Sequence, residues 1–330
     1  MLLILTWAII ISFIIMMYVL LDGFDLGIGI LFPWIRKNQY RDIMMSSVMP
    51  VWDGNETWLV FGAAALYAAF PMAYSTLLPT LYMPIMILLV SLIFRGVAFE
   101  FRFKAQHSRF IWDTAFAIGS ILAAFTQGVI LGTFVQGYGD HLPLSHSAYQ
   151  WLTPFSVFTG FAVVGGYALL GATWLIVKTE SDLQNLLYRA AKILLGVVSV
   201  CLAVVSIWTP FVDPRIMQRW FSLPNFFYLS PLPLLTIVVV LYNFYCLYKQ
   251  KEKSPFVLSM GLFVLAYVGF CISVWPYIIP HVIPVWEAAA APSTLKFTLY
   301  GTIILLPILL VYTACSYHVF RGKIKEAIHY

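Results

Sequence analysis

The sequence predicts an all-α integral membrane protein, a single polytopic domain that covers residues 1–330. Of its 330 residues, 62% are hydrophobic and only 10% are charged, and the mean hydropathy is +0.89. Soluble domains carry about 25% charged residues. Apolar runs of about 20 residues, the length that one transmembrane helix needs, recur along the chain. We therefore expect the lipid bilayer to solvate most of its surface.

Nine apolar runs are long enough to be transmembrane helices. Pro-rich or charged stretches such as 213–215, 249–253 and 280–284 separate them, and no polar stretch is long enough for a water-soluble domain. The first run lacks the positively charged start and the cleavage site of a signal peptide, so we expect it to be retained as a helix. The predicted spans are 4–33, 53–72, 75–100, 112–137, 153–178, 190–212, 227–248, 256–279 and 296–320.

Basic residues predict the orientation of these spans. Fifteen of the 19 Lys and Arg residues fall in alternate connections, which would lie on one side of the membrane. These fifteen are Arg36, Lys37, Arg41, Arg102, Lys104, Arg109, Lys178, Arg189, Lys192, Lys249, Lys251, Lys253, Arg321, Lys323 and Lys325. The other side has Arg215, Arg219 and Lys296, and Arg95 lies within a span. Because basic loops stay in the cytoplasm, the N-terminus should be periplasmic and the C-terminus cytoplasmic, which agrees with an odd number of spans.

Six acidic residues should then lie at the cytoplasmic side of the first four spans. They are Asp22, Asp25, Asp53, Glu56, Glu100 and Asp113. Ionisable groups at membrane depth are costly and indicate function by default. Arg95 is the expected charge partner for one or two of the carboxylates, and the remainder should bind protons because burial disfavours the charged form. The first five acids are therefore predicted to form a proton uptake path, with no catalytic residue in the chain.

Some of these residues also fit simpler structural roles. Asp53 precedes an apolar run, and a carboxylate there also stabilises a helix N-terminus. Glu100 and Asp113 fit interface positions with access to water, and Trp286-Glu287 fits a solvated loop end. Asp25 is harder to explain in this way because its helix continues apolar on both sides.

Glycines and cysteines are assigned to packing. Gly23, Gly27 and Gly29 have the small-residue spacing that lets another helix approach closely, which would hold Asp25 against protein rather than lipid. The four cysteines lie in apolar runs without CxxC spacing, so they predict neither a metal site nor disulfides. They are Cys201, Cys246, Cys271 and Cys315.

The histidines predict that this chain binds no haem itself. Haem in a membrane protein needs axial ligands such as His or Met at membrane depth. All six histidines, His107, His141, His146, His281, His318 and His329, lie in predicted loops or at span ends. There is also no phosphate-binding loop, no GxGxxG and no HExxH motif, and topology accounts for the basic loops without nucleic-acid binding.

Two motifs together resemble subunit II of the cytochrome bd-type quinol oxidases. They are Asp22-Gly23-Phe24-Asp25-Leu26-Gly27-Ile28-Gly29 and Trp52-Asp53-Gly54-Asn55-Glu56-Thr57-Trp58-Leu59. Two further stretches are similar to the family, Phe94-Arg95-Gly96-Val97-Ala98-Phe99-Glu100 and Trp286-Glu287, where the family often has Trp-Asp. The family commonly has Gln-Val at the positions of Glu56-Thr57, so this chain places an extra acid beside Asp53. Its short outer connections resemble the cyanide-insensitive branch.

The resemblance implies a fold of nine helices, arranged as two four-helix bundles plus one peripheral helix. It implies a haem-free subunit of the bacterial inner membrane whose partner, subunit I, carries haems b and d and the quinol-oxidising loop. Together the subunits would oxidise quinol and reduce dioxygen to water with cytoplasmic protons. Asp25, Asp53 and Glu100 match acidic positions of the family. Some members also hold a quinone within subunit II, and a small accessory membrane subunit is a further expected partner.

Two other functions stay open on sequence grounds alone. One is a proton-coupled transporter that acts without a partner, although no internal repeat is visible and the Pro clusters lie at span ends. The other is a purely structural scaffold whose acids only bind the partner subunit.

Overall fold

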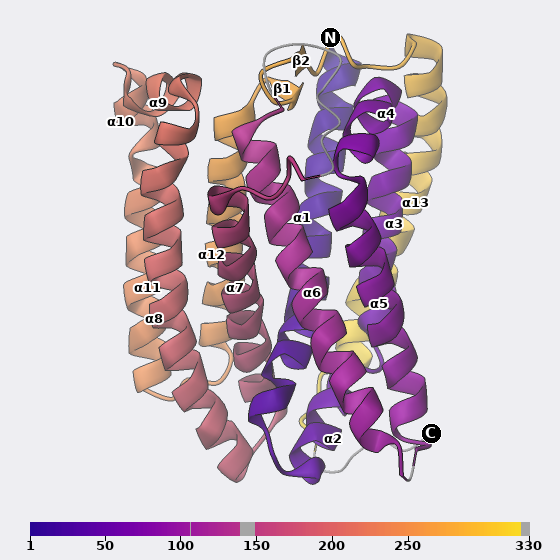
Figure 1. The fold of residues 1–330 in the computed structure, drawn as a ribbon, viewed down its shortest axis with the longest axis vertical. Coiled ribbons are helices and arrows are strands. Elements are labelled where there is room, and N and C mark those ends of the chain that lie inside the picture. The colour runs from indigo at the N-terminus through magenta and orange to yellow at the C-terminus, as the bar shows by residue number, and fades with distance from the viewer. Residues whose placement is uncertain (106, 139–148, 325–330) are drawn as a thin grey trace.

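The protein is almost entirely helical in the computed structural model, which describes residues 1–105, 107–138 and 149–324 (Figure 1). The helices and strands are α1 (Leu2–Leu31), the 3₁₀ helix η1 (Phe32–Trp34), α2 (Asn38–Ser46), α3 (Trp52–Ala69), α4 (Pro71–Thr80), α5 (Tyr82–Arg102), α6 (Arg109–Gln136), α7 (Pro154–Lys178), α8 (Ser181–Val212), α9 (Pro214–Phe221), α10 (Asn225–Leu229), α11 (Pro231–Tyr248), α12 (Ser254–Val274), β1 (Tyr277–Ile279), β2 (Ile283–Pro284) and α13 (Pro292–Val319). The two short strands pair antiparallel. The all-α prediction is confirmed for these residues.

Eight helical segments of the described residues are long and apolar enough to cross a membrane. They are Leu2–Trp34, Tyr82–Arg102, Arg109–Gln136, Pro154–Lys178, Ser181–Val212, Asn225–Tyr248, Ser254–Val274 and Pro292–Val319. The predicted span 53–72 corresponds to α3, which is not among the eight. Helix α3 nevertheless runs antiparallel to α1, because its Asn55 side chain reaches the Leu21 carbonyl while the Trp58 ring contacts Phe13. A ninth crossing and the two-bundle arrangement stay predictions.

Two predicted span boundaries are wrong, since the chain breaks at Phe70 and again at Leu81. Helix α3 ends at Ala69, and α4 starts at Pro71. A proline disfavours helical geometry in the residue before it, which explains the break at Phe70. Pro84 has no N–H for the Thr80 carbonyl and its ring crowds that group, so α4 ends at Thr80. The predicted span 75–100 is therefore the second half of α4 followed by α5.

Proline and local capping set where most later helices begin. Prolines occupy the first or second position of α7, α9, α11, α12 and α13, where a missing N–H costs nothing. At the start of α7, the Ser156 N–H donates to the Thr153 hydroxyl at 3.1 Å, and the Thr153 N–H donates to the Ser156 hydroxyl at 2.9 Å. This reciprocal capping box fixes the start of α7.

Helix α1 lies at the centre of the helical packing. It contacts α3, α6 and α7, while α5 packs on α6, α8 on α7 and α11 on α12. Figure 1 shows α13 at one side of the molecule and α8 and α11 at the other. Helices α1 and α7 approach each other backbone to backbone, where Gly27 faces the Tyr167 carbonyl and Gly171. This approach holds the second half of α1, including both its aspartates, inside the protein.

One end of the molecule, here called the basic end, contains α2 and the α5–α6, α7–α8 and α11–α12 connections (Figure 1). Residues 320–324, which follow α13, form a strap across this end. The Ile324 N–H donates to the Lys178 carbonyl at 2.9 Å, and the Lys178 ammonium donates to the Phe320 carbonyl. The Lys323 ammonium pairs with Glu252 at 2.6 Å. The strap thus ties the end of α13 to α7 and to the α11–α12 connection.

Acid is expected to loosen this strap. Hydrogen bonds from Lys323 and from Gln184 lower the pKa of Glu252 below its ordinary value. A carboxyl group whose pKa is lower in the folded state stabilises that state above its unfolded pKa of about 4.3, and this contribution disappears as the pH falls through the folded pKa. The protection of the amides of residues 320–324 against hydrogen exchange, relative to their intrinsic rates at each pH, should therefore fall below about pH 4. Glu252→Gln should show the faster exchange already at pH 7, and unchanged exchange in that variant would contradict the strap.

Candidate functional site: a buried ion cluster between α1, α3 and α5

Two of the acids predicted from the sequence pair with Arg95, and a third, Asp25, lies close to them. The Arg95 side chain, from α5, is fully buried, and its Nη1 lies 2.8 Å from Oδ1 of the buried Asp22 of α1. Its Nη2 pairs with the Glu56 carboxylate of α3, whose side chain is 24% exposed. Arg95 is therefore the charge partner of two carboxylates from two other helices. A guanidinium suits this position because its donors are arranged in a planar fork.

Asp25 completes the cluster without pairing directly with Arg95. It is fully buried one helical turn after Asp22, and the Asn55 amide donates a 2.7 Å hydrogen bond to its Oδ2. The same amide donates to the Leu21 carbonyl at 3.3 Å, and the Asn55 carbonyl oxygen accepts a 2.9 Å hydrogen bond from the Tyr317 hydroxyl of α13. Asp25 also lies within range of electrostatic interaction with Asp22, Arg95 and Glu56. We call Asp22, Asp25, Glu56 and Arg95 the ion cluster.

A second set of polar side chains extends from Asp22 toward the other end of the molecule. The Gln127 amide of α6 donates to the Tyr18 hydroxyl at 2.9 Å, and its oxygen accepts from the Tyr167 hydroxyl at 2.7 Å. Tyr18 lies one helical turn before Asp22 on α1. A Cβ atom on Gly23 would lie 2.7 Å from the Tyr167 ring, so this glycine leaves the space that the ring occupies.

Two other acids of the predicted path lie apart from the ion cluster. Asp53 is exposed in the first turn of α3, where Val51 and not Asp53 is the N-cap residue. Glu100 is exposed as well, and its carboxylate lies 3.7 Å from the Lys104 ammonium one turn later. Glu287 is also exposed, in the segment that leads into α13. The structure thus brings together Asp22, Asp25, Glu56 and Arg95, but not Asp53 or Glu100.

The sixth acid, Asp113, belongs to a different ion-pair network at the basic end. Arg41 pairs with Asp113 at 2.8 Å, and the fully buried Arg102 pairs with both Asp113 and Asp42. Arg109 also pairs with Asp42. This network joins α2, α5 and α6. The sequence analysis used these arginines only to predict the orientation of the spans, and it did not single out Asp42.

Asn55 and Tyr317 extend the ion cluster through hydrogen bonds, and the sequence analysis singled out neither of them as a site residue. Asn55 lies between Asp53 and Glu56 in the second of the two motifs. An amide at this position can donate a hydrogen bond to one group and accept one from another. Tyr317 is 262 residues away from Asn55 along the chain, and no sequence pattern pointed to it.

The described histidines lie outside the ion cluster. His107 and His318 are exposed near helix ends, and His281 lies between β1 and β2, 3.2 Å from Asp213. His141, His146, His329 and Lys325 fall outside the described residues. Across the part of the chain that the structure describes, no group of three or more His, Cys, Asp or Glu residues could hold a metal ion. The four cysteines are free thiols.

The fold and the site define a polytopic α-helical membrane protein with a buried carboxylate–arginine cluster. The chain matches the model of the family described as cytochrome bd terminal oxidase subunit II over residues 3–320, and it belongs to that family. The resemblance seen in the sequence is therefore confirmed. Membership implies a quinol oxidase complex, an oxidoreductase, in which this subunit is joined by a subunit I in the bacterial inner membrane.

Relatives cover nearly the whole chain. It is 27% identical to the cytochrome bd-I ubiquinol oxidase subunit 2 of Escherichia coli over 358 residues, which cover 97% of this chain and 94% of that one. It is 28% identical over 339 residues to the cytochrome bd ubiquinol oxidase subunit 2 of Bacillus subtilis, with 98% of both chains covered. A chain of the bd oxidase structure from Geobacillus thermodenitrificans has the same fold, with a TM-score of 0.81, 15% identity, and 97% and 99% of the two chains covered.

Proposed function

We propose that this chain is the haem-free subunit II of a bd-type quinol oxidase and that its ion cluster takes up protons from the cytoplasm. Subunit I would hold haems b and d, oxidise quinol and carry out the four-electron reduction of dioxygen to water. This chain would stabilise the complex and supply part of the proton path. In the proposed orientation, nine spans place the N-terminus in the periplasm and the basic end in the cytoplasm.

The charge balance of the ion cluster carries the proposal. Three carboxyl groups meet one guanidinium, so full ionisation would leave two negative charges uncompensated in a buried site. Uncompensated buried charge is costly, and binding a proton removes it. Because protonation removes the excess negative charge, exchange of a proton among these carboxyls costs little free energy. Replacement of Arg95 by a neutral residue would cost much more. This combination suits a proton relay better than a permanent set of ion pairs.

The order of exposure suggests a direction for the path. Asp53 is exposed at the start of α3, Glu56 lies one turn further and is partly exposed, and Asp25 is fully buried. Asp53 and Glu56 interact electrostatically. We assign Asp53 to collecting protons at the surface, Glu56 and Asp22 to passing them beside Arg95, and Asp25 to the innermost position. Glu100 stays on the surface with Lys104 and has no place in this route.

Asp25→Asn is the direct test of this route. Asparagine keeps the size of the side chain and can still accept the Asn55 hydrogen bond, but it cannot bind or release a proton. Oxygen consumption by the purified complex is expected to fall by about tenfold or more, because positioned proton transfer usually contributes at least this much. The haem absorption spectrum should not change. Glu180→Gln removes an exposed acid at the basic end and should leave the rate unchanged.

The alternatives give different results in the same experiment. A complex that loses its haem in Asp25→Asn would favour a scaffold role, and an unchanged rate would exclude Asp25 from proton uptake. If the chain purifies without a haem-bearing partner and moves a solute in liposomes, the oxidase assignment fails and a transporter is favoured.

A further inference from the structure

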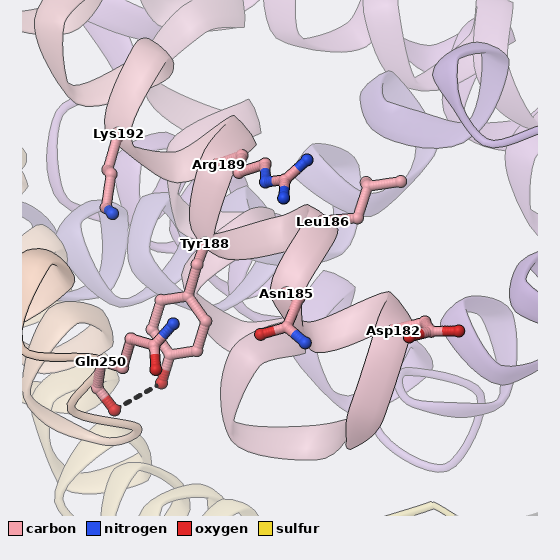
Figure 2. Close-up of a pocket in the computed structure, with 7 residues that line it drawn as sticks. All are labelled: Asp182, Asn185, Leu186, Tyr188, Arg189, Lys192 and Gln250. Atoms are coloured by element: carbon pink, nitrogen blue, oxygen red, sulfur yellow. Dashed lines mark hydrogen bonds between the residues drawn. The ribbon is translucent and has the colours of Figure 1, made fainter.

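A groove of about 480 Å³ opens at the basic end, between the first turns of α8 and the α11–α12 connection (Figure 2). It is lined by Asp182, Asn185, Leu186, Tyr188, Arg189, Lys192 and Gln250. The Tyr188 hydroxyl donates to the Gln250 carbonyl at 2.8 Å and closes one wall. In Figure 2, Leu186 and Arg189 project to one side of α8, while Tyr188 and Lys192 project toward Gln250.

Arg189 and Asp182, two charged groups of this groove, have no ion-pair partner among the described residues. By contrast, three arginines elsewhere at the basic end, Arg41, Arg102 and Arg109, form ion pairs with Asp42 and Asp113. In the described ranges, neither Arg189 nor Asp182 belongs to an ion pair of this kind. Lys192 lies 4.7 Å from the centre of the Tyr248 ring. The groove therefore offers both a cation and an anion to a ligand.

The depth of these residues corresponds to the headgroup layer. Helix α8 has 32 residues. At 1.5 Å per residue it is about 48 Å long, longer than the bilayer core of about 30 Å, so its first turns extend beyond the hydrocarbon. Arg189 lies about 12 Å from the start of the helix by the same measure, near the boundary between headgroups and acyl chains. Tyr188 and Tyr248 suit this boundary because their rings are amphipathic.

One face of α8 changes from charged to apolar along its length. Asp182, Asn185, Leu186 and Arg189 have the i, i+3, i+4, i+7 spacing of a single helix face. The exposed side chains that follow on this face of α8 are apolar, namely Ile193, Val197 and Val200. From the basic end inward, the face thus presents a carboxylate, then an amide and a guanidinium, then aliphatic groups.

We propose that this groove binds a phospholipid whose headgroup carries a primary amine beyond its phosphate. Arg189 and Asn185 bind the phosphate, and Asp182 binds the ammonium group. An acyl chain lies along Ile193 and Val197. The order of charges matches such a zwitterion, whereas a free phosphate would use neither Asp182 nor the apolar side chains. Arginine binds phosphate through two parallel hydrogen bonds, which favours this assignment.

Lipid binding to the purified two-subunit complex tests the proposal. The delipidated complex is titrated with phosphatidylethanolamine, phosphatidylglycerol or phosphatidylcholine of equal chain length, and bound lipids are counted by native mass spectrometry. Phosphatidylethanolamine should bind most tightly, because the quaternary amine of phosphatidylcholine cannot donate a hydrogen bond to Asp182. Arg189→Gln should weaken its binding about tenfold, as expected for loss of a charge-assisted hydrogen bond.

Asp182→Asn separates the two halves of the site. It should lower the affinity for phosphatidylethanolamine to that for phosphatidylglycerol, while the latter affinity stays the same or rises. Lys253→Gln removes an exposed charge at the same end, outside the groove, and should change nothing. Equal binding of the three lipids, or unchanged binding in both groove variants, would overturn the proposal. Tightest binding of phosphatidylglycerol to the unmodified complex would overturn the assignment of Asp182.

Discussion

Arg95→Met is expected to prevent assembly of a stable complex. The substitution leaves Asp22 and Glu56 beside each other without their shared cation, and Asp22 is almost completely buried. Removal of one partner from a buried ion pair typically costs about 3–5 kcal/mol. This cost is a large part of the stability of most folded proteins. The yield of haem-containing complex and its thermal unfolding temperature should both fall sharply.

Restoring the charge balance provides the control for this prediction. Replacement of a whole buried ion set by neutral side chains is often close to neutral for stability. Arg95→Met combined with Asp22→Asn and Glu56→Gln should therefore regain much of the yield and unfolding temperature, while the rate of oxygen consumption stays low. If the single Arg95→Met variant assembled with an unchanged unfolding temperature, the ion cluster would not be a stabilising element.

Gly27→Ala is expected to have the second large effect, because α1 and α7 meet backbone to backbone at this position. A Cβ atom on Gly27 would lie 1.8 Å from the Tyr167 carbonyl oxygen and 2.8 Å from the Gly171 nitrogen. Neither atom can move by a change of rotamer, so the two helices must separate. Overpacking of this kind costs about 1–3 kcal/mol or more. Thermal unfolding of the purified complex should show a clearly lower transition.

Gly196→Ala is the matched control, since a Cβ atom at this position of α8 meets nothing within 4 Å. It should unfold at the same temperature as the unmodified complex, or slightly higher, because alanine favours a helix over glycine. Equal unfolding temperatures for Gly27→Ala and Gly196→Ala would mean that the close approach of α1 and α7 contributes little to stability.

Composition and hydropathy predict most of this fold, because apolar helices long enough to cross a bilayer leave a strong signal. The same physics explains why charged residues inside those runs, such as Asp22 and Arg95, marked the site. The break at Leu81 was missed because hydropathy counts a proline little, while the effect of Pro84 on the Thr80 carbonyl is a matter of hydrogen bonding.

Depth in the membrane can be predicted from sequence, but the direction in which a side chain points needs the helix period as well. Glu100 was grouped with Arg95 because both fall near the same end of α5. Five residues correspond to a rotation of about 140° around a helix, so Glu100 points to the surface while Arg95 points inward. Asp53 and Asn55 differ in the same way on α3, where Asn55 is buried and Asp53 is exposed.

The hydrogen bond between Asn55 and Tyr317 has a consequence for biosynthesis. Asn55 orients its amide toward Asp25 while its own oxygen accepts from a residue 262 positions later. During translation, the first helices therefore enter the membrane long before their last polar contact exists. The cluster reaches its final geometry only after the ribosome has finished the C-terminal helix, so premature termination leaves a chain whose acidic interior is incomplete.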